Sequence, residues 1–147
     1  MITVNSLGLS EANLVIQAGI RRATEIGSPS TVCVVDVGGI VIAQARMDGS
    51  LLCSVELAYS KAYTALSCKL ATSFIKTIAQ PGGDFYGIAN GLGGRAIIFP
   101  GGVPISVDGQ VVGAVGASGG NGNQDEDVAQ SAATAVSQFM IASGEQQ

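Results

Sequence analysis

Residues 103–116, VPISVDGQVVGAVG, decide the fold that we expect for this chain. Two runs rich in valine, Val103–Val107 and Gln110–Gly116, flank the pair Asp108-Gly109. An Asp-Gly pair between two such runs favours a tight turn, because both residues tolerate the positive φ angles that this turn requires. The stretch therefore predicts a β-hairpin in the second half of the chain.

A second hairpin is predicted nearer the N-terminus. Thr31–Val37 and Ile40–Arg46 are apolar, β-branched runs that Gly38-Gly39 separates. Arg95–Phe99 adds a short strand ahead of the later hairpin. Because hairpins join neighbouring strands in opposite directions, we expect a mostly antiparallel sheet of about five strands.

Apolar residues that recur at steps of three and four predict four helices. The first has Ser10 as its N-cap and ends at Ile26, the second covers about 53–70, Thr72 caps a short third, and the last begins near Asn123. Such helices can cover both faces of the sheet. The predicted fold is a layered α/β sandwich in which residues 1–147 form a single domain.

The composition is poor in charge. Only 12% of the residues are charged and 47% are hydrophobic, whereas about 25% charge is usual in soluble domains. So few charged residues leave apolar surface uncovered on a single copy, and large apolar patches mark interfaces. We therefore expect a homo-oligomer.

The charge pattern also limits partners and location. A net charge of −4 without any basic run argues against nucleic acid as a partner. Polar residues interrupt every apolar stretch before it reaches the roughly 18–20 residues that span a membrane. Residues 1–10 lack the features of a secretory signal, and the three cysteines are widely spaced. We expect a cytoplasmic protein that does not bind membranes.

The chain contains no histidine. Ser-His-Asp and Cys-His catalysis are therefore excluded, and the commonest ligand of zinc and haem iron is missing, so we predict no metal site. The candidates for acid–base chemistry are Glu56, Lys61 and Glu126. Glu56 and Lys61 lie about 140° apart around a helix, so that one of them can point into a cleft. The cysteines are expected to be buried, with Cys53 as the exception.

A glycine-rich stretch, Gly113–Gly122, joins the last strand to the last helix. Backbone N–H groups at Gly119 and Gly120 can hold a phosphate or carboxylate. The stretch lacks the G-x-G-x-x-G spacing and the P-loop lysine, however, and the carboxylates at 125–127 repel anions. We favour the interpretation that these carboxylates stabilise the positive end of the helix dipole.

Further candidates for ligand binding are Arg46, Asp48, Phe85, Tyr86 and Asp125. Arg46 and Asp48 also fit a structural role, in which Asp48 forms a turn and Arg46 pairs with it. The rings of Phe85 and Tyr86 can stack on a planar ligand or fill the core. The residue types alone do not decide between these roles.

Six stretches, in order along nearly the whole chain, resemble the GlcG/HbpS-like family. They are Val34–Asp36, Arg46–Gly49, Lys61–Ala65, Gly101–Ile105, Val111–Gly116 and Gln124–Glu126. Three more resemble its small members associated with glycerol or propanediol utilisation and the C-terminal domain of the PduO type. These are Gln80–Gly82, Tyr86-Gly87 and Ile97–Phe99.

The resemblance implies a central antiparallel sheet between helices and assemblies that are often octameric. It implies no single function and no particular cofactor. Some relatives bind haem or degraded tetrapyrroles, and haem-binding relatives use a histidine ligand that this chain lacks. Haem held by an axial histidine is thus excluded, which leaves Met47, a cysteine or a tyrosine as less usual ligands.

Our first hypothesis on function is a protein that binds a small organic molecule or cofactor without converting it. Its pocket lies at a subunit interface and is formed by residues 46–56, 84–86 and 119–126. The resemblance connects such a protein with glycerol, diol or glycolate metabolism.

The second hypothesis is a small lyase, isomerase or hydrolase. Glu56 or Glu126 would act as general base, and Lys61 or Arg46 would stabilise an oxyanion. A third interpretation is an accessory subunit that only scaffolds a metabolic assembly. We favour binding, because no spacing in the sequence holds two titratable groups together.

Overall fold

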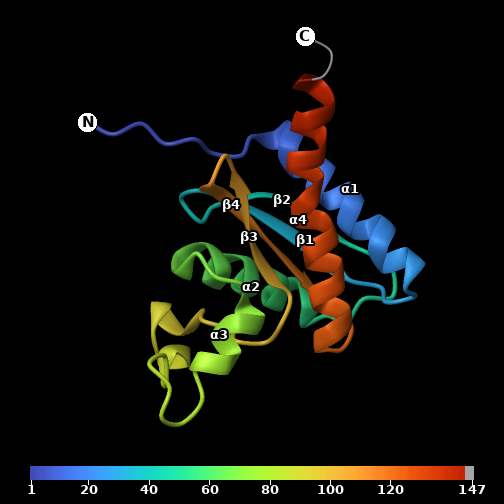
Figure 1. Ribbon diagram of the computed structural model, residues 1–147. Coiled ribbons are helices and arrows are strands. Elements are labelled where there is room, and N and C mark those ends of the chain that lie inside the picture. The colour runs from blue at the N-terminus through green and yellow to red at the C-terminus, as the bar shows by residue number, and fades with distance from the viewer. Residues whose placement is uncertain (145–147) are drawn as a thin grey trace.

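A sheet of four antiparallel strands lies between two layers of helices (Figure 1). The computed structural model describes residues 1–144. In chain order the elements are α1 (Leu9–Glu25), β1 (Thr31–Asp36), β2 (Val41–Arg46), α2 (Ser54–Cys68), α3 (Thr72–Ile78), the short 3₁₀ helices Ile88–Asn90 and Leu92–Gly94, β3 (Gly102–Val107), β4 (Gln110–Ser118) and α4 (Gly122–Gly144). The strand order is β2-β1-β4-β3, so that β1 and β4 are central.

Both predicted hairpins form, but their turns differ. The later turn has φ values of 50° at Asp108 and 76° at Gly109, as the Asp-Gly pair predicts. The turn between β1 and β2 spans residues 37–40 instead of two glycines. There the carboxylate of Asp36 accepts hydrogen bonds from the backbone N–H groups of Gly38 (2.8 Å) and Ile40 (3.0 Å), which stabilises the wider turn.

The predicted fifth strand, Arg95–Phe99, is wrong. This segment runs across α2 and α3 without joining the sheet, because threonine side chains satisfy its backbone. Thr64 accepts the N–H of Ile97 at 3.0 Å, and Thr72 donates to the carbonyl of Phe99 at 2.7 Å. The described part of the sheet therefore has four strands.

The helices lie close to their predicted positions, but Ser10 is not the N-cap of α1. The cap is Gly8, whose backbone N–H donates to the carboxylate of Glu11 at 2.9 Å. The hydroxyl of Ser10 donates to the other oxygen of that carboxylate. Glu11 therefore stabilises the helix start by binding a free N–H group and by its charge.

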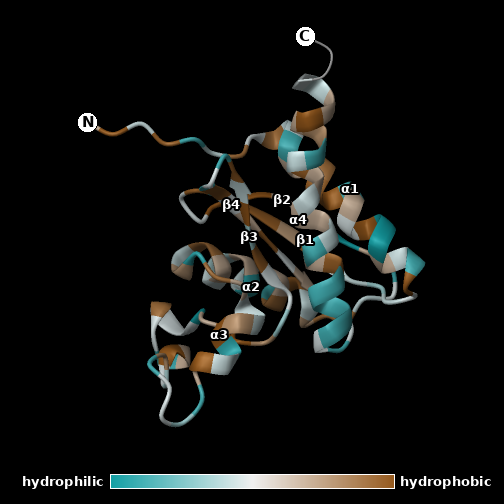
Figure 2. Cartoon of the chain, viewed as in Figure 1, coloured by the Kyte–Doolittle hydropathy of each residue, from teal (hydrophilic) through white to brown (hydrophobic). Residues whose placement is uncertain are grey.

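Each face of the sheet has its own apolar core. One lies under α1 and α4 and includes Val15, Val34, Val115, Val128 and Val136. The other lies under α2 and consists of smaller residues. The strands are accordingly hydrophobic along their length, whereas the first turns of α4 are hydrophilic (Figure 2).

Helix α2 packs unusually close to the sheet. Gly102 of β3 and Gly116 of β4 are paired across the two strands. A Cβ atom at Gly116 would overlap the carbonyl of Ala58, and one at Gly102 would overlap the carbonyl of Lys61. These two glycines therefore let the backbone of α2 rest directly on the strands.

This contact predicts that Gly116→Ala destabilises the protein by about 1–3 kcal/mol or more, because the added methyl group must displace a helix backbone. Chemical denaturation of Gly116→Ala and Gly144→Ala measures the effect. A Cβ atom at Gly144 would meet no other atom within 4 Å, so this variant should keep the wild-type free energy of unfolding. Equal stability of the two variants would contradict the close contact.

Candidate functional site

A cavity of about 170 Å³ lies where β4 ends and α4 begins. Three kinds of group line it: apolar side chains, the backbone of a glycine loop, and a pair of buried charges. The lining residues are Leu51, Cys53, Ser54, Leu57, Lys61, Phe99, Ser118, Gly119, Gly120, Gly122 and Asp125. Helix α2 and the loop before α4 thus meet at this point.

Lys61 is the largest fully buried side chain, with 1% of its surface exposed. Its ammonium group donates to Asp125 Oδ2 at 2.8 Å and to the carbonyl of Ala117 at 3.0 Å. An ammonium group has three N–H donors, so one remains for a ligand. The neighbouring core residues on α2 are alanines, whose small size lets the lysine stem reach the end of β4.

Asp125 completes the ion pair from the first turn of α4 and is 4% exposed. Its Oδ1 accepts the backbone N–H of Gly120 at 2.9 Å. The carboxylate therefore has a cation, a backbone donor and the positive end of a helix dipole around it. Such a pair is electrically compensated, which is the condition for burying two charges.

The interpretation that all three carboxylates at 125–127 cap α4 is incomplete. The cap is formed by Asn121 and Gln124, each side chain accepting the other residue's backbone N–H at 2.9 and 3.0 Å. The carboxylates instead make tertiary contacts. Asp127 forms two hydrogen bonds with Arg22 of α1, and the guanidinium lowers the pKa of the Asp127 carboxyl.

The glycine loop is shaped by close packing. A Cβ atom at Gly119 would overlap the carbonyl of Pro29, and one at Gly120 would overlap the side chains of Ser28 and Gln124. The N–H of Gly120 is already used by Asp125. Both positions therefore require glycine because a larger side chain would not fit. Gly120 could help to bind an anion only if its N–H were free.

Among the described residues, neither predicted general base forms an ion pair or hydrogen bond with Lys61, although Glu126 and Lys61 both lie near Gly101. Glu56 is exposed in the first turn of α2. Glu126 accepts hydrogen bonds from Ser73 (2.9 Å) and from the N–H of Gly101 (3.0 Å), so it joins α4 to α3 and to the residue before β3. The carboxylate beside Lys61 is that of Asp125.

Arg46 and Asp48 lie in a separate surface hollow with Met47 and Gly49. Arg46 donates to the carbonyl of Ser50 at 3.1 Å, and the described residues show no ion pair between Arg46 and Asp48. The turn role of Asp48 fits this geometry, but the predicted pairing does not.

Phe85 and Tyr86 also lie away from the cavity. They line an open hollow of about 350 Å³ in the loop after α3, and 68% of Tyr86 is exposed. Within one chain, residues 51–57 and 118–125 thus share a cavity and residues 84–86 do not. A pocket formed by all three segments between subunits stays a prediction.

Sequence reasoning missed Phe99 and Leu57 as cavity residues. Phe99 was expected to end a strand, but it is 55% exposed beside the cavity. The sequence did indicate that Lys61 is buried, because Ala58, Ala62 and Ala65 place it on an apolar face of the helix. Its partner was not visible, because 64 residues separate the two.

The three cysteines differ in exposure as predicted, with Cys53 as the exposed one. Cys33 is buried, and burial raises the pKa of its thiol to about 12. Cys68 is partly buried, with a raised pKa for the same reason. Cys53 is exposed at the cavity.

The part of the chain that the structure describes contains no cluster of three or more acidic or cysteine side chains suited to a metal ion. In the same residues, every helix is too short or too polar to cross a membrane.

The fold and the site define a small α/β protein with an antiparallel sheet and a charge-compensated cavity at one end of it. Residues 7–134 match the family model described as "Haem degrading protein HbpS-like", and the chain belongs to this family. The resemblance inferred from the sequence motifs is thereby confirmed.

Three relatives illustrate the match. The crystal structure of Klebsiella pneumoniae protein ORFY has a TM-score of 0.89 and 37% identity, covering 93% of this chain and 94% of that one. A crystal structure of a PduOC:heme complex has a TM-score of 0.84 and 37% identity over 88% of this chain and 94% of that one. Corrinoid adenosyltransferase PduO of Salmonella typhimurium is 37% identical over 89% of this chain, which spans 39% of that protein's length.

The family description raises the question whether haem fits here. The sulfur of Met47 accepts the N–H of Ser30 at 3.4 Å and packs against the core. Cys33 is fully buried in the sheet. Cys53 lines a cavity of about 170 Å³, which is below the about 300–1,000 Å³ of typical ligand sites and too small for a macrocycle.

The tyrosines offer no better ligand. The hydroxyls of Tyr59 and Tyr63 accept hydrogen bonds from Arg95 at 3.2 and 3.0 Å. Tyr86 lies in the open hollow described above. None of Met47, Cys33, Cys53, Tyr59 and Tyr63 therefore combines a free ligating atom with a cavity large enough for haem.

The buried pair yields a test by double substitution. Lys61→Met leaves the Asp125 carboxylate buried without its cation, so we expect a loss of about 3–5 kcal/mol in the free energy of unfolding. Asp125→Asn should destabilise the wild type but stabilise Lys61→Met, because it removes the uncompensated charge. Urea denaturation of the four proteins measures this coupling.

Lys76→Met serves as the control, because Lys76 is exposed on α3 and a surface substitution should stay within about 0.5 kcal/mol. Additive effects of the Lys61 and Asp125 substitutions would show that the pair does not stabilise the fold in this way.

Proposed function

We propose that this protein binds a small, uncharged organic molecule bearing hydroxyl or carbonyl oxygens in the Lys61–Asp125 cavity, without converting it. The observation that carries the proposal is the buried ion pair at the floor of a cavity with apolar walls. A few polar groups among apolar side chains are typical of ligand sites.

The charges favour a neutral ligand. Asp125 compensates Lys61 at 2.8 Å, so an anion entering the cavity meets little net positive charge and loses its hydration. The remaining N–H of Lys61 can donate to an uncharged oxygen. The hydroxyl of Ser118, which lines the same cavity, can donate or accept.

The size favours a short molecule. A water molecule occupies about 30 Å³ in the liquid, so 170 Å³ holds a ligand with only a few non-hydrogen atoms. Glycerol and 1,2-propanediol have this size and chemistry. The sequence resemblance to members associated with glycerol or propanediol utilisation supports the same class.

The surroundings of the cavity support a homo-oligomer. Leu51 and Phe99 line it yet are 61% and 55% exposed, and Leu52 beside them is 78% exposed. A second copy packed here would bury these side chains and close the cavity, which matches the low charge of the chain. The ligand would then lie between subunits.

The enzymatic alternative finds less support. It needs Glu56 or Glu126 as a base near Lys61 or Arg46, but Glu56 is exposed and Glu126 is bound to Ser73 and Gly101. A general base must lie within hydrogen-bond reach of the proton that it removes.

Protein-observed NMR titration with 1,2-propanediol, glycerol and glycolate tests the binding proposal. We expect the two neutral compounds to shift resonances of the cavity residues, and glycolate to bind more weakly. Phe99→Ala should weaken diol binding roughly tenfold, about 1.4 kcal/mol, because one apolar wall is lost. Phe74→Ala, a phenylalanine of similar exposure on α3, serves as the matched control.

Absence of shifts at millimolar diol, or equal weakening by both phenylalanine variants, would refute binding in this cavity. New ligand resonances that grow with time would instead favour the enzymatic alternative.

Sedimentation velocity at micromolar concentration tests the assembly. We expect wild-type protein to sediment as an oligomer and Leu52→Asp to shift towards smaller species, because a charge enters the apolar contact. Asn90→Asp adds the same charge at an exposed polar residue and should leave the assembly intact. A wild-type protein that sediments as a stable single chain would refute the oligomer.

A further inference from the structure

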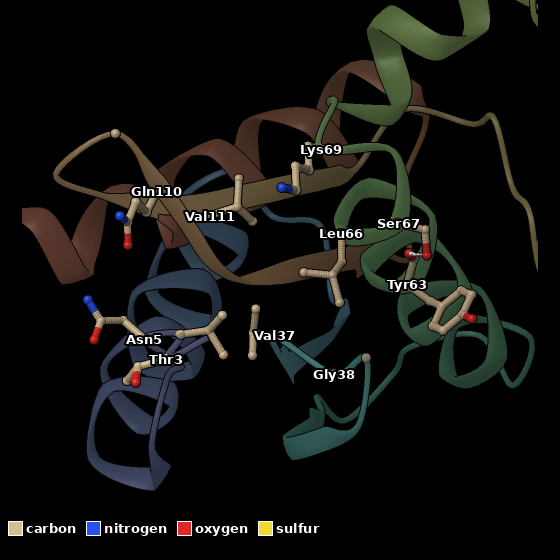
Figure 3. Close-up of a pocket in the computed structure, with 13 residues that line it drawn as sticks. Thr3, Asn5, Val37, Gly38, Tyr63, Leu66, Ser67, Lys69, Gln110 and Val111 are labelled. Carbon is tan, nitrogen blue, oxygen red and sulfur yellow. Dashed lines mark hydrogen bonds between the residues drawn. The ribbon is translucent and has the colours of Figure 1, made fainter. Parts of the chain in front are cut away.

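A second cavity, of about 600 Å³, lies at the opposite end of β4 from the Lys61–Asp125 cavity. Its floor is apolar and is formed by Val37, Leu66 and Val111. Figure 3 shows polar side chains around this floor, with Lys69 and Gln110 on one side and Asn5 on the other. The volume falls within the about 300–1,000 Å³ of typical small-molecule sites.

The walls of this cavity are held by specific contacts. On one side the N-terminal segment is attached to the sheet, since Leu7 donates to the carbonyl of Val112 at 3.0 Å and Ser6 accepts the N–H of Val37 at 3.1 Å. On the other side Gly39 has a φ of 81°, and a Cβ atom there would lie 3.0 Å from the ring of Tyr63. The cavity is therefore largely preformed.

Lys69 is the residue that gives the cavity a charge. It ends α2 with a left-handed backbone, φ 53° and ψ 35°, a conformation that glycine adopts at helix ends far more readily than lysine. Within residues 1–144 it forms no ion pair. Lys69 is exposed, so its ammonium group is open to a ligand that enters the cavity, and the left-handed backbone fixes where its side chain starts.

We propose that this cavity binds a small monocarboxylate with a short aliphatic chain. The carboxylate pairs with the Lys69 ammonium, and the chain covers Leu66, Val111 and Val37 towards the end of the cavity that Gln110 and Asn5 line. Among the residues that the structure describes, Lys69 is the one charged residue that lines the cavity, and a single cation matches one negative charge. A phosphate group would call for more donors than this rim supplies.

The proposal does not depend on the function proposed for the Lys61–Asp125 cavity. The two cavities share no lining residue. One ligand is charged and aliphatic, and the other is neutral and short. Each site can therefore fail its test without affecting the other.

Isothermal titration calorimetry with hexanoate and hexanamide tests the second site. We expect hexanoate to bind and hexanamide, which has the same shape without the charge, to bind at least tenfold more weakly. Lys69→Gly should lower hexanoate affinity at least tenfold and leave the melting temperature unchanged or raised, because glycine relieves the left-handed strain.

Lys69→Asn provides a second neutral variant, since asparagine also tolerates this backbone. Lys76→Gln removes one positive charge outside the cavity, and Phe99→Ala alters only the other site, so both should retain hexanoate binding. No heat with hexanoate at millimolar concentration, equal binding of hexanamide, or unchanged affinity in both Lys69 variants would overturn the proposal.

Discussion

Direct contact between the backbone of α2 and the glycines of β3 and β4 is the constraint on which the rest of the structure depends. Gly102 and Gly116 lack the Cβ atoms that would hold the helix away from the sheet. The alanines of α2 fill the remaining space, so this layer is thin. Because α2 lies so close to the sheet, the Lys61 side chain reaches the last residues of β4 and the start of α4.

The Lys61–Asp125 pair follows from that position and connects three elements. It joins α2 to Asp125 of α4 and to the carbonyl of Ala117 at the end of β4. Two charges are kept from water here only because each has hydrogen-bond partners. The same compensation leaves the cavity beside the pair with hydrogen-bond donors but little net charge.

The two ends of the sheet carry different chemistry. At the end of β4 near Ser118, charges are paired and the rim is apolar and exposed. At its beginning near Gln110, a lysine without an ion-pair partner among the described residues lies beside polar side chains. Helix α2 contributes lining residues to each of the two cavities. The two cavities of this small domain therefore differ in charge and in lining.

Local patterns in the sequence determined the elements that depend on neighbouring residues. The Asp108-Gly109 turn and the helical spacing of apolar residues are properties of short segments, and both form as predicted. The order of the motifs determined the family, which the match over residues 7–134 confirms. The absence of histidine excluded axial histidine ligation of haem without any structure.

Only the tertiary structure decided which residues meet. Arg95–Phe99 has the composition of a strand, but Thr64 and Thr72, distant in sequence, bind its backbone instead. Lys61 and Asp125 were candidates separately, and their pairing depends on how closely α2 approaches β4. The physical reason is that side-chain spacing along a helix or strand is a local property, whereas ion pairs and cavities arise from packing between segments far apart in the chain.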